Sequence, residues 1–421
     1  MFYFIQQIKT QFSSNFNHFF AISILSVYPI TYFIGTGIVN LSVVLIDLVL
    51  IIEIIKNKKY LFFKNIIFYY LCGLWLILLL NLTSSIDPQN SLGRSVGFIR
   101  YIFFVMAIIY YFNVNEQKYK KIILSIWSII FLIISIDLIY EFFFGKNLLG
   151  FTSYMPGRLA GFFNDELKIG HFYYGFCLII LSYLINSKFL KQSNFIKYKF
   201  SEENIIFICI FVFIIMSFII GERSNFIKTL IMLSLFIFVI KLNFNKKKLT
   251  LVFGIIIIFF LTINLNQGYK SRFLNQLIIP FVKNPISYIS STNYGDHYKF
   301  GIKIFLDNKL FGVGLKNYRI EVGNKGYVNS SIHPHQTHIE ILSELGIIGY
   351  LTFIIFFALN FLNYRKNFSQ NNRYYNLAGL LFIITSLLPI LPSGSFFTSH
   401  AATLFWMNFA FMNLSEKNTK I

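Results

Sequence analysis

Residues 333–350 read HPHQTHIEILSELGIIGY, a polar segment with three histidines that passes directly into an apolar one. Ile339, Leu342, Leu345 and Gly349 recur at the spacing of one helix face. This pattern predicts a helix that begins at about Gln336. The rest of the chain is far more apolar, so we expect it to form a scaffold that holds these polar residues at one surface.

The composition is that of a membrane protein. Of the 421 residues, 56% are hydrophobic and only 13% are charged. Apolar runs of about 20 residues are long enough to cross a hydrocarbon core of about 30 Å. Spans in lipid must satisfy their own backbone hydrogen bonds, which favours helices, and solid Ile, Leu and Phe runs do not show the alternation of a membrane β-barrel. The sequence predicts an all-α polytopic membrane protein, with residues 1–421 forming one integral membrane domain.

The apolar runs predict about twelve transmembrane helices. The first two are separated only by a Gly-Thr-Gly turn near Gly35. The expected spans are 19–37, 39–55, 66–82, 96–112, 121–143, 168–186, 204–220, 225–242, 249–265, 345–362, 374–390 and 401–414.

Lysine and arginine gather in every second predicted loop, for example between Lys56 and Lys64 and between Lys188 and Lys199. Because positive residues favour the cytoplasmic side, we expect these loops and both termini in the cytoplasm. The net charge of +20 is then a topology signal that also attracts an anionic inner leaflet. The lipid bilayer is therefore an expected partner, and nucleic acid is not.

Two of the alternate, outward-facing loops are long, and they span roughly residues 144–167 and 266–344. Loops of the second size are usually functional or partly folded, so we expect short amphipathic helices there, for example around Tyr298–Leu310. Four acids within or near spans are interpreted as helix-end or internally hydrogen-bonded groups: Asp47, Glu53, Asp137 and Glu141.

Three arginines fall on the outward side of this topology. Arg158 lies in the first long loop, Arg223 in a tight turn and Arg319 in the second long loop, which also contains His335. Each arginine alone fits interfacial snorkelling or an ion pair, such as Glu222 with Arg223. Together they favour an anion site, because the planar guanidinium binds phosphate oxygens through paired hydrogen bonds. A lipid-linked diphosphate would lie at this depth.

His335 precedes the predicted helix N-terminus, where free amides and the helix dipole favour an anion. A histidine there can accept a proton from a hydroxyl near neutral pH. A metal site built from His333, His335, His338 and Glu340 is the rival interpretation, but the segment lacks the His-Glu-x-x-His arrangement. We therefore expect no metal, with His333 and His338 as loop or helix-cap residues. Gly312-x-Gly314 is interpreted as a turn.

These residues resemble the signature of the bacterial O-antigen ligase / O-antigen polymerase superfamily. His335-Gln336 followed at a set spacing by Gly346-x-x-Gly349 is similar to its histidine motif. Three further segments resemble other family motifs: 157–164 (GRLAGFFN), 221–224 (GERS) and 311–319 (FGVGLKNYR).

The resemblance implies a GT-C-like membrane glycosyltransferase in the bacterial inner membrane, with a periplasmic active site. The donor would be a glycan on undecaprenyl diphosphate, and the transfer would invert the anomeric carbon without metal or cofactor. Arg158, Arg223 and Arg319 would then bind the diphosphate. His335 would act as base or orient the leaving phosphate. The supporting residues would be Gln336, His338, Gly314, Gly346 and Gly349.

Within this family the sequence favours a ligase that acts on lipid A–core, because of the histidine motif and the long loop after the ninth span. A polymerase that joins repeat units onto a growing glycan is the alternative. A lipid-linked glycan transporter is a more distant one, since it would show repeated halves and charges along a central path, whereas no repeat is visible here.

Overall fold

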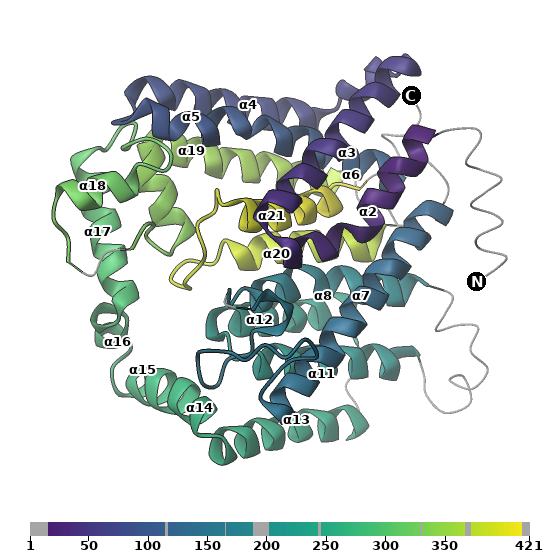
Figure 1. The fold of residues 1–421 in the computed structure, drawn as a ribbon, viewed down its shortest axis with the longest axis vertical. Helices are drawn as coiled ribbons and strands as arrows, with labels where there is room; N and C mark the ends of the chain where they lie inside the picture. Colours follow the sequence, from purple (N-terminus) through teal and green to yellow (C-terminus); the bar gives the residue numbers. More distant parts are fainter. Residues whose placement is uncertain are drawn as a thin grey trace.

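The computed structural model describes residues 16–113, 117–164, 166–187, 202–242, 246–328, 331–366 and 372–414. All regular secondary structure in these ranges is helical, as Figure 1 shows. Within the same ranges, nine helices are long and apolar enough to cross a membrane. The prediction of an all-α, multi-pass membrane protein is therefore confirmed.

Each of the twelve predicted spans overlaps a helix of the structure. The helices α20 and α21 have 14 residues each, which is short for a helix that must cross a bilayer. The count of twelve spans therefore stays a prediction. The corresponding helices are α2 (Phe16–Ile34), α3 (Thr36–Lys56), α4 (Ile66–Leu80), α6 (Ile99–Asn113), α7 (Gln117–Phe144), α8 (Ile169–Asn186), α11 (Glu202–Ile219), α12 (Arg223–Ile240), α13 (Lys246–Leu265), α19 (Thr337–Lys366), α20 (Arg373–Ser386) and α21 (Ser399–Met412).

The predicted hairpin at Gly35 is present. Gly35 has a φ of 140°, a backbone conformation that favours glycine, and it separates α2 from α3. The fourth span differs from its prediction, because a helix with several polar residues, α5 (Pro88–Gly97), precedes α6 and joins it at Phe98. This polar helix faces the segment after α17, as described below.

The second long loop is largely helical. It contains α14 (Gln267–Tyr269), the π-helix η4 (Lys270–Ile278), α15 (Ile279–Lys283), α16 (Pro285–Ser291), α17 (Asn293–Asp307) and α18 (Tyr318–Asn324). These elements follow one edge of the molecule from α13 to α19 in Figure 1. The amphipathic helix expected around Tyr298–Leu310 corresponds to α17.

The helix α19 begins at Thr337, close to its predicted start, but it is broken at Gly346, where φ is 67° and ψ is −168°. A Cβ at this position would lie 2.3 Å from the carbonyl oxygen of Leu310. The backbone of Ile347 donates to the Lys309 carbonyl at 2.8 Å. The second long loop therefore packs directly against the break, and the continuous helix face expected through Gly349 is wrong beyond Leu345.

Three of the four buried acids have internal partners. Glu53 accepts hydrogen bonds from Tyr110 and Tyr111 at 2.9 and 3.0 Å. Asp137 accepts one from the backbone of Leu148 at 2.8 Å. Glu141 accepts two from the loop after α7, and it holds the segment that follows Arg158.

Candidate active site

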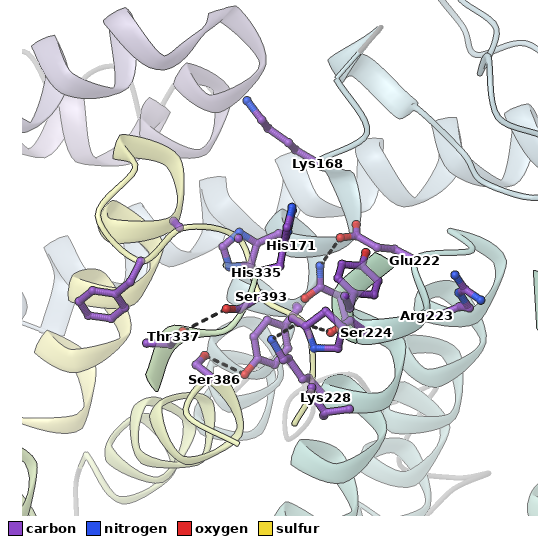
Figure 2. A pocket seen from close by; sticks show the side chains of 18 of the residues that line it. Lys168, His171, Glu222, Arg223, Ser224, Lys228, His335, Thr337, Ser386 and Ser393 are labelled. Carbon is purple, nitrogen blue, oxygen red and sulfur yellow. Dashed lines mark hydrogen bonds between the residues drawn. The ribbon is translucent and has the colours of Figure 1, made fainter. Parts of the chain in front are cut away.

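A cavity of about 1630 Å³ lies between α5, α8, α12, η4 and the N-terminus of α19, and Figure 2 shows part of it. Among the residues that the structure describes, its lining contains eight cationic side chains and one carboxylate. These charged residues are Arg94, Arg100, Arg158, Lys168, Arg223, Lys228, Arg272, Lys316 and Glu222. The lining is therefore suited to an anion.

Three glycines bring the first group of cations together. A Cβ on Gly221 would lie 2.0 Å from the carbonyl oxygen of Gly157, and one on Gly157 would lie 2.4 Å from the backbone of Gly268. Only residues without side chains allow three chain segments to approach this closely. Their neighbours Arg158, Arg223 and η4 are thereby held at one place.

Glu141 fixes the first of these segments from below. Its carboxylate accepts hydrogen bonds from the backbone of Ala160 at 2.9 Å and of Gly161 at 2.7 Å. Asn147 donates to the Gly161 carbonyl at 2.7 Å. The loop that carries Arg158 is thus anchored to α7 by buried hydrogen bonds, which are costly to leave unmade.

Arg158 forms the ion pair that the sequence suggested for Arg223. Its guanidinium lies 3.3 Å from Glu222 Oε2 and also donates to the Leu167 carbonyl. Asn225 donates to the other carboxylate oxygen at 2.6 Å. Burial raises the pKa of Glu222, and Arg158 and Lys228 oppose that rise. Glu222 directly precedes α12 and lies beside the first long loop. Its side chain points toward Arg158 and not along the helix that begins at Arg223.

Arg223 and Arg272 lie beside each other. Arg223 donates to the carbonyl oxygens of Arg272 and Gln276, each at 3.3 Å, and Arg272 donates through Nε to the Gly221 carbonyl at 3.2 Å. Burial, and then the charges of Arg223 and Arg158, lower the pKa of Arg272 to about 10. Three guanidinium groups thus repel one another across the cavity, and a bound anion would relieve that repulsion.

The segment before α21 closes another side of the cavity. The Pro392 carbonyl accepts from Ser224, and it accepts from Lys228 at 3.1 Å. Lys228 is only 4% exposed and lies within electrostatic reach of Glu222. A buried lysine near a helix start usually marks a functional group or a specific pairing.

His335 lines the same cavity and lies in Figure 2 between Thr337 and Arg223. Its φ of 54° is uncommon for a residue with a side chain. The backbone carbonyl of His335 accepts from Ser393 at 2.8 Å, and Nε2 lies 3.0 Å from Ser331 Oγ. The surrounding structure therefore holds the imidazole in a strained but well-defined position.

The imidazole of His335 is neutral at pH 7. Burial, and then the nearby His297, lower its pKa to about 4. A neutral imidazole can accept a proton, and a nearby anion would stabilise the imidazolium that forms. The ring also lies close to Tyr294, with centroids 5.4 Å apart, and Tyr294 is within electrostatic reach of Arg272. His335 and the arginine group therefore share one site.

The three clustered rings of His297, His333 and His335 do not match a metal site. The His333 and His335 centroids lie 3.9 Å apart, and those of His297 and His335 lie 5.2 Å apart. In the described ranges, no group of three or more His, Cys, Asp or Glu residues has a geometry that could hold a metal ion. Both ring nitrogens of His333 are buried without a hydrogen-bond partner.

Arg319 is not brought to the cavity lining with Arg158 and Arg223. It lies in α18, within electrostatic reach of Arg94 and Glu344, and its Nε is buried without a hydrogen-bond partner. The turn at Gly312–Gly314 directs this part of the chain toward α5. Among the described residues, Arg319 makes no direct contact with Arg158 or Arg223. Its role at the diphosphate therefore stays a prediction.

The supporting residues have structural contacts. Gln336 accepts a hydrogen bond from Ile339 at 2.8 Å, as a helix N-cap does. His338 donates to the Leu387 carbonyl at 2.8 Å and joins α19 to the end of α20. A Cβ on Gly314 would lie 2.1 Å from Ser85 Oγ, and one on Gly349 would lie 2.3 Å from the Leu345 side chain. These positions maintain close packing within and beside α19.

Sequence reasoning missed several cations of the lining. Arg94 lies just before the predicted span 96–112, Arg100 lies inside that span, and Lys228 lies inside the predicted span 225–242. Charged residues inside apolar runs are a recognised signal of function, so Arg100 and Lys228 were detectable. Arg272 and Lys316 lie in a long loop without periodicity, and only the fold brings them to the cavity.

Comparisons with known proteins agree with this site. A sequence model of the O-antigen ligase family matches residues 206–354, which include Arg223, Arg272 and His335. No match was found among curated proteins. The matched segment and the helical membrane fold bear out the resemblance seen in the motifs. Over residues 206–354 the chain is therefore similar to the O-antigen ligase family, and this match supports the O-antigen ligase/polymerase superfamily and a glycosyltransferase-like activity.

Proposed function

We propose that this protein transfers a glycan from undecaprenyl diphosphate to an acceptor hydroxyl at the periplasmic face of the bacterial inner membrane. The observation that carries the proposal is the cavity lined by eight cations and one carboxylate, with a strained neutral histidine in its wall. A lipid-linked diphosphate is the anion that matches both the charge of this lining and the membrane fold.

Arg158, Arg223 and Arg272 bind the diphosphate. Their guanidinium groups neutralise the charge that develops as the bond between the anomeric carbon and the diphosphate oxygen breaks. Of the sequence-predicted set, Arg319 lies outside the cavity lining, and its part in diphosphate binding stays a prediction. Lys228 and Glu222 hold the arginine group in place.

His335 accepts the proton of the acceptor hydroxyl while the acceptor oxygen bonds to the anomeric carbon. The bonding electrons leave with the diphosphate, and the attack on the opposite face inverts the anomeric carbon. His335 is neutral before the reaction, and the diphosphate charge stabilises its protonated form afterwards. Arginines supply the charge stabilisation that a divalent ion gives in other glycosyltransferases, so the reaction proceeds without metal.

The acceptor is lipid A–core, which makes the enzyme an O-antigen ligase; the histidine motif and the long loop after the ninth span support this choice. A polymerase that joins repeat units is the second candidate. A deletion strain separates the two. Bare core with accumulated lipid-linked polymer indicates a lost ligase, whereas core capped by single repeats indicates a lost polymerase.

Purified protein in detergent tests the chemistry. With a lipid-linked glycan and lipid A–core, transfer should persist in the presence of a chelator, and loss of transfer would refute the metal-free mechanism. Transfer in detergent also excludes the transporter alternative, because no gradient is present to drive one.

A further inference from the structure

The cavity contains a second cationic group, separate from the arginines of the proposed diphosphate site. Arg94, Arg100 and Lys316 line it from α5, the start of α6 and the segment before α18. The arginines of the proposed diphosphate site come instead from the first long loop, the start of α12 and η4. One diphosphate therefore leaves these three cations without an anionic ligand.

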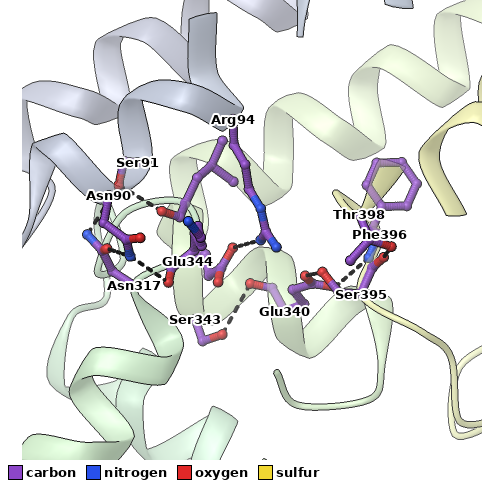
Figure 3. A network of polar contacts seen from close by, with 12 residues as sticks. Asn90, Ser91, Arg94, Asn317, Glu340, Ser343, Glu344, Ser395, Phe396 and Thr398 are labelled. Carbon is purple, nitrogen blue, oxygen red and sulfur yellow. Dashed lines mark hydrogen bonds and ion pairs between the residues drawn. The ribbon is translucent and has the colours of Figure 1, made fainter. Parts of the chain in front are cut away.

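The side of α5 that faces the cavity is built for this group. Asn90, Gly93 and Arg94 line the cavity, and their spacing places them on one helix face. Gly93 has open space where a Cβ would project. Asn90 donates to the Lys316 carbonyl at 3.1 Å, so Lys316 is held beside the same face, as Figure 3 shows for Asn90 and its neighbours.

A buried network fixes the segment that carries Lys316. The Asn317 amide donates to Ser85 Oγ at 2.6 Å, to Ser91 Oγ at 3.2 Å and to the Val313 carbonyl at 3.0 Å. Lys316 itself has a φ of 67°, which is strained for a residue with a side chain. Such strain persists only where the surrounding contacts impose it, and it is frequent at ligand sites.

Within the described ranges, only Arg94 of this group pairs with the nearby acids. Arg94 lies 3.9 Å from Glu344, at the limit of an ion pair. The Glu340 carboxylate is occupied by Ser395 and by the backbone of Phe396 at 2.8 Å. In the part of the chain that the structure describes, Arg100 and Lys316 form no ion pair, although Asp47 lies within electrostatic reach of Arg100.

Arg100 has one terminal nitrogen available as a donor. Nη2 donates to the Tyr101 hydroxyl at 2.9 Å, and within the described part of the chain Nη1 forms no hydrogen bond. Nη1, unlike the buried Nε, is not enclosed by protein. Phosphate and carboxylate oxygens are the acceptors that suit this geometry.

His335 adjoins both cationic groups. Tyr294 lies 5.4 Å from His335 between ring centroids and is within electrostatic reach of Arg272. His333 lies 3.9 Å from His335 between ring centroids and is within electrostatic reach of Arg94. An acceptor whose hydroxyl reaches His335 can therefore place a second anion at the Arg94 group while the diphosphate occupies the Arg272 group.

We propose that Arg94, Arg100 and Lys316 bind a second anionic group, a phosphate, carried by the acceptor. This inference rests on the proposed function, since it assigns the acceptor half of the same cavity. It makes acceptor charge a determinant of specificity, while the donor glycan contacts the remainder of the lining.

Transfer kinetics with two acceptors test the inference. The probes are lipid A–core with its phosphates intact and the same material after chemical removal of the phosphates, each with an undecaprenyl-diphosphate donor whose glycan is neutral. Loss of one charge-assisted contact should raise the acceptor KM about tenfold. We expect this rise for Arg100→Gln and Lys316→Gln with the phosphorylated acceptor, and almost none with the dephosphorylated one.

Two controls keep the test specific. Lys316→Arg retains the charge and should restore the acceptor KM. Lys299→Gln removes an exposed lysine that pairs with Asp296 outside the cavity, and it should leave both acceptors unaffected. Donor KM should stay unchanged in all variants.

The outcomes separate this inference from the proposed function. Wild-type protein that transfers to neither acceptor overturns the proposed function. Wild-type transfer in which both variants lose equal activity on the two acceptors overturns the acceptor site alone. A change in donor KM, or dependence on an acidic donor glycan, places the anion on the donor and also contradicts the inference.

Discussion

Arg272→Gln should lower the transfer activity without lowering the stability of the protein. The lowered pKa of Arg272, about 10 against the ordinary 12.5, reflects burial and repulsion by Arg223 and Arg158. A drop of that size corresponds to about 3 kcal/mol that disfavours the charged side chain in the ligand-free site. Because Arg272 is partly exposed, solvent screening reduces this to about 1–2 kcal/mol.

The substitution also removes a contact. The hydrogen bond from Arg272 Nε to the Gly221 carbonyl, at 3.2 Å, is worth about 1 kcal/mol. The two effects nearly cancel, so the ligand-free variant should unfold at the wild-type temperature or slightly above it. The bound donor, in contrast, loses a charge-assisted partner worth about 2–3 kcal/mol, which is a fall of about 30- to 150-fold in kcat/KM.

Thermal unfolding in detergent and initial rates of glycan transfer measure the two effects on the same preparation. Arg365→Gln is the matched control, since it removes an exposed arginine at the end of α19, away from the cavity, and should alter neither quantity. An Arg272→Gln variant that unfolds several degrees lower, or that keeps the wild-type kcat/KM, would refute the reasoning.

Three further predictions concern the scaffold and the base. Glu141→Ala should lower the free energy of unfolding by about 2 kcal/mol, because the Arg158 loop loses two backbone hydrogen bonds. It should also slow glycan transfer, and an unchanged transfer rate would contradict the role of this loop at the site. The kcat/KM of the wild-type enzyme should stay level from pH 7 to about pH 5 and fall near pH 4, because the lowered pKa of His335 keeps the imidazole neutral above that pH. A fall in kcat/KM that begins near pH 6.5 would argue against His335 as the base. Gly346→Ala should destabilise by about 2 kcal/mol or more in unfolding measurements, whereas Gly323→Ala, with open space around it, should be nearly neutral.

The convergence of the main site residues was predictable because topology alone supplies it. Arg158, Arg223 and His335 come from distant segments, yet alternate loops of a helical membrane protein lie on the same side. The sequence therefore predicted that these residues meet. It did not predict how they are oriented, because the Glu222–Arg158 pair depends on close contact among Gly157, Gly221 and Gly268.

Other features depended on contacts that periodicity does not encode. Arg272 belongs to a π-helix, and its side chain reaches the cavity only through tertiary packing. Gly346-x-x-Gly349 is compatible with a continuous helix, and the break at Gly346 arises from close approach to the Leu310 backbone. Arg319 was grouped with Arg158 and Arg223 because all three lie on the predicted outward side, but α18 places it within electrostatic reach of Arg94 and outside the cavity lining.

The most direct test of the account is glycan transfer by purified His335→Ala protein. With a lipid-linked donor, a lipid A–core acceptor and wild-type levels of folded protein, we expect transfer to fall by a factor of about 100 or more, as for loss of a general base. Binding of the lipid-linked donor should remain, because Arg158, Arg223 and Arg272 are unchanged. Full transfer by the His335→Ala protein would contradict the central claim.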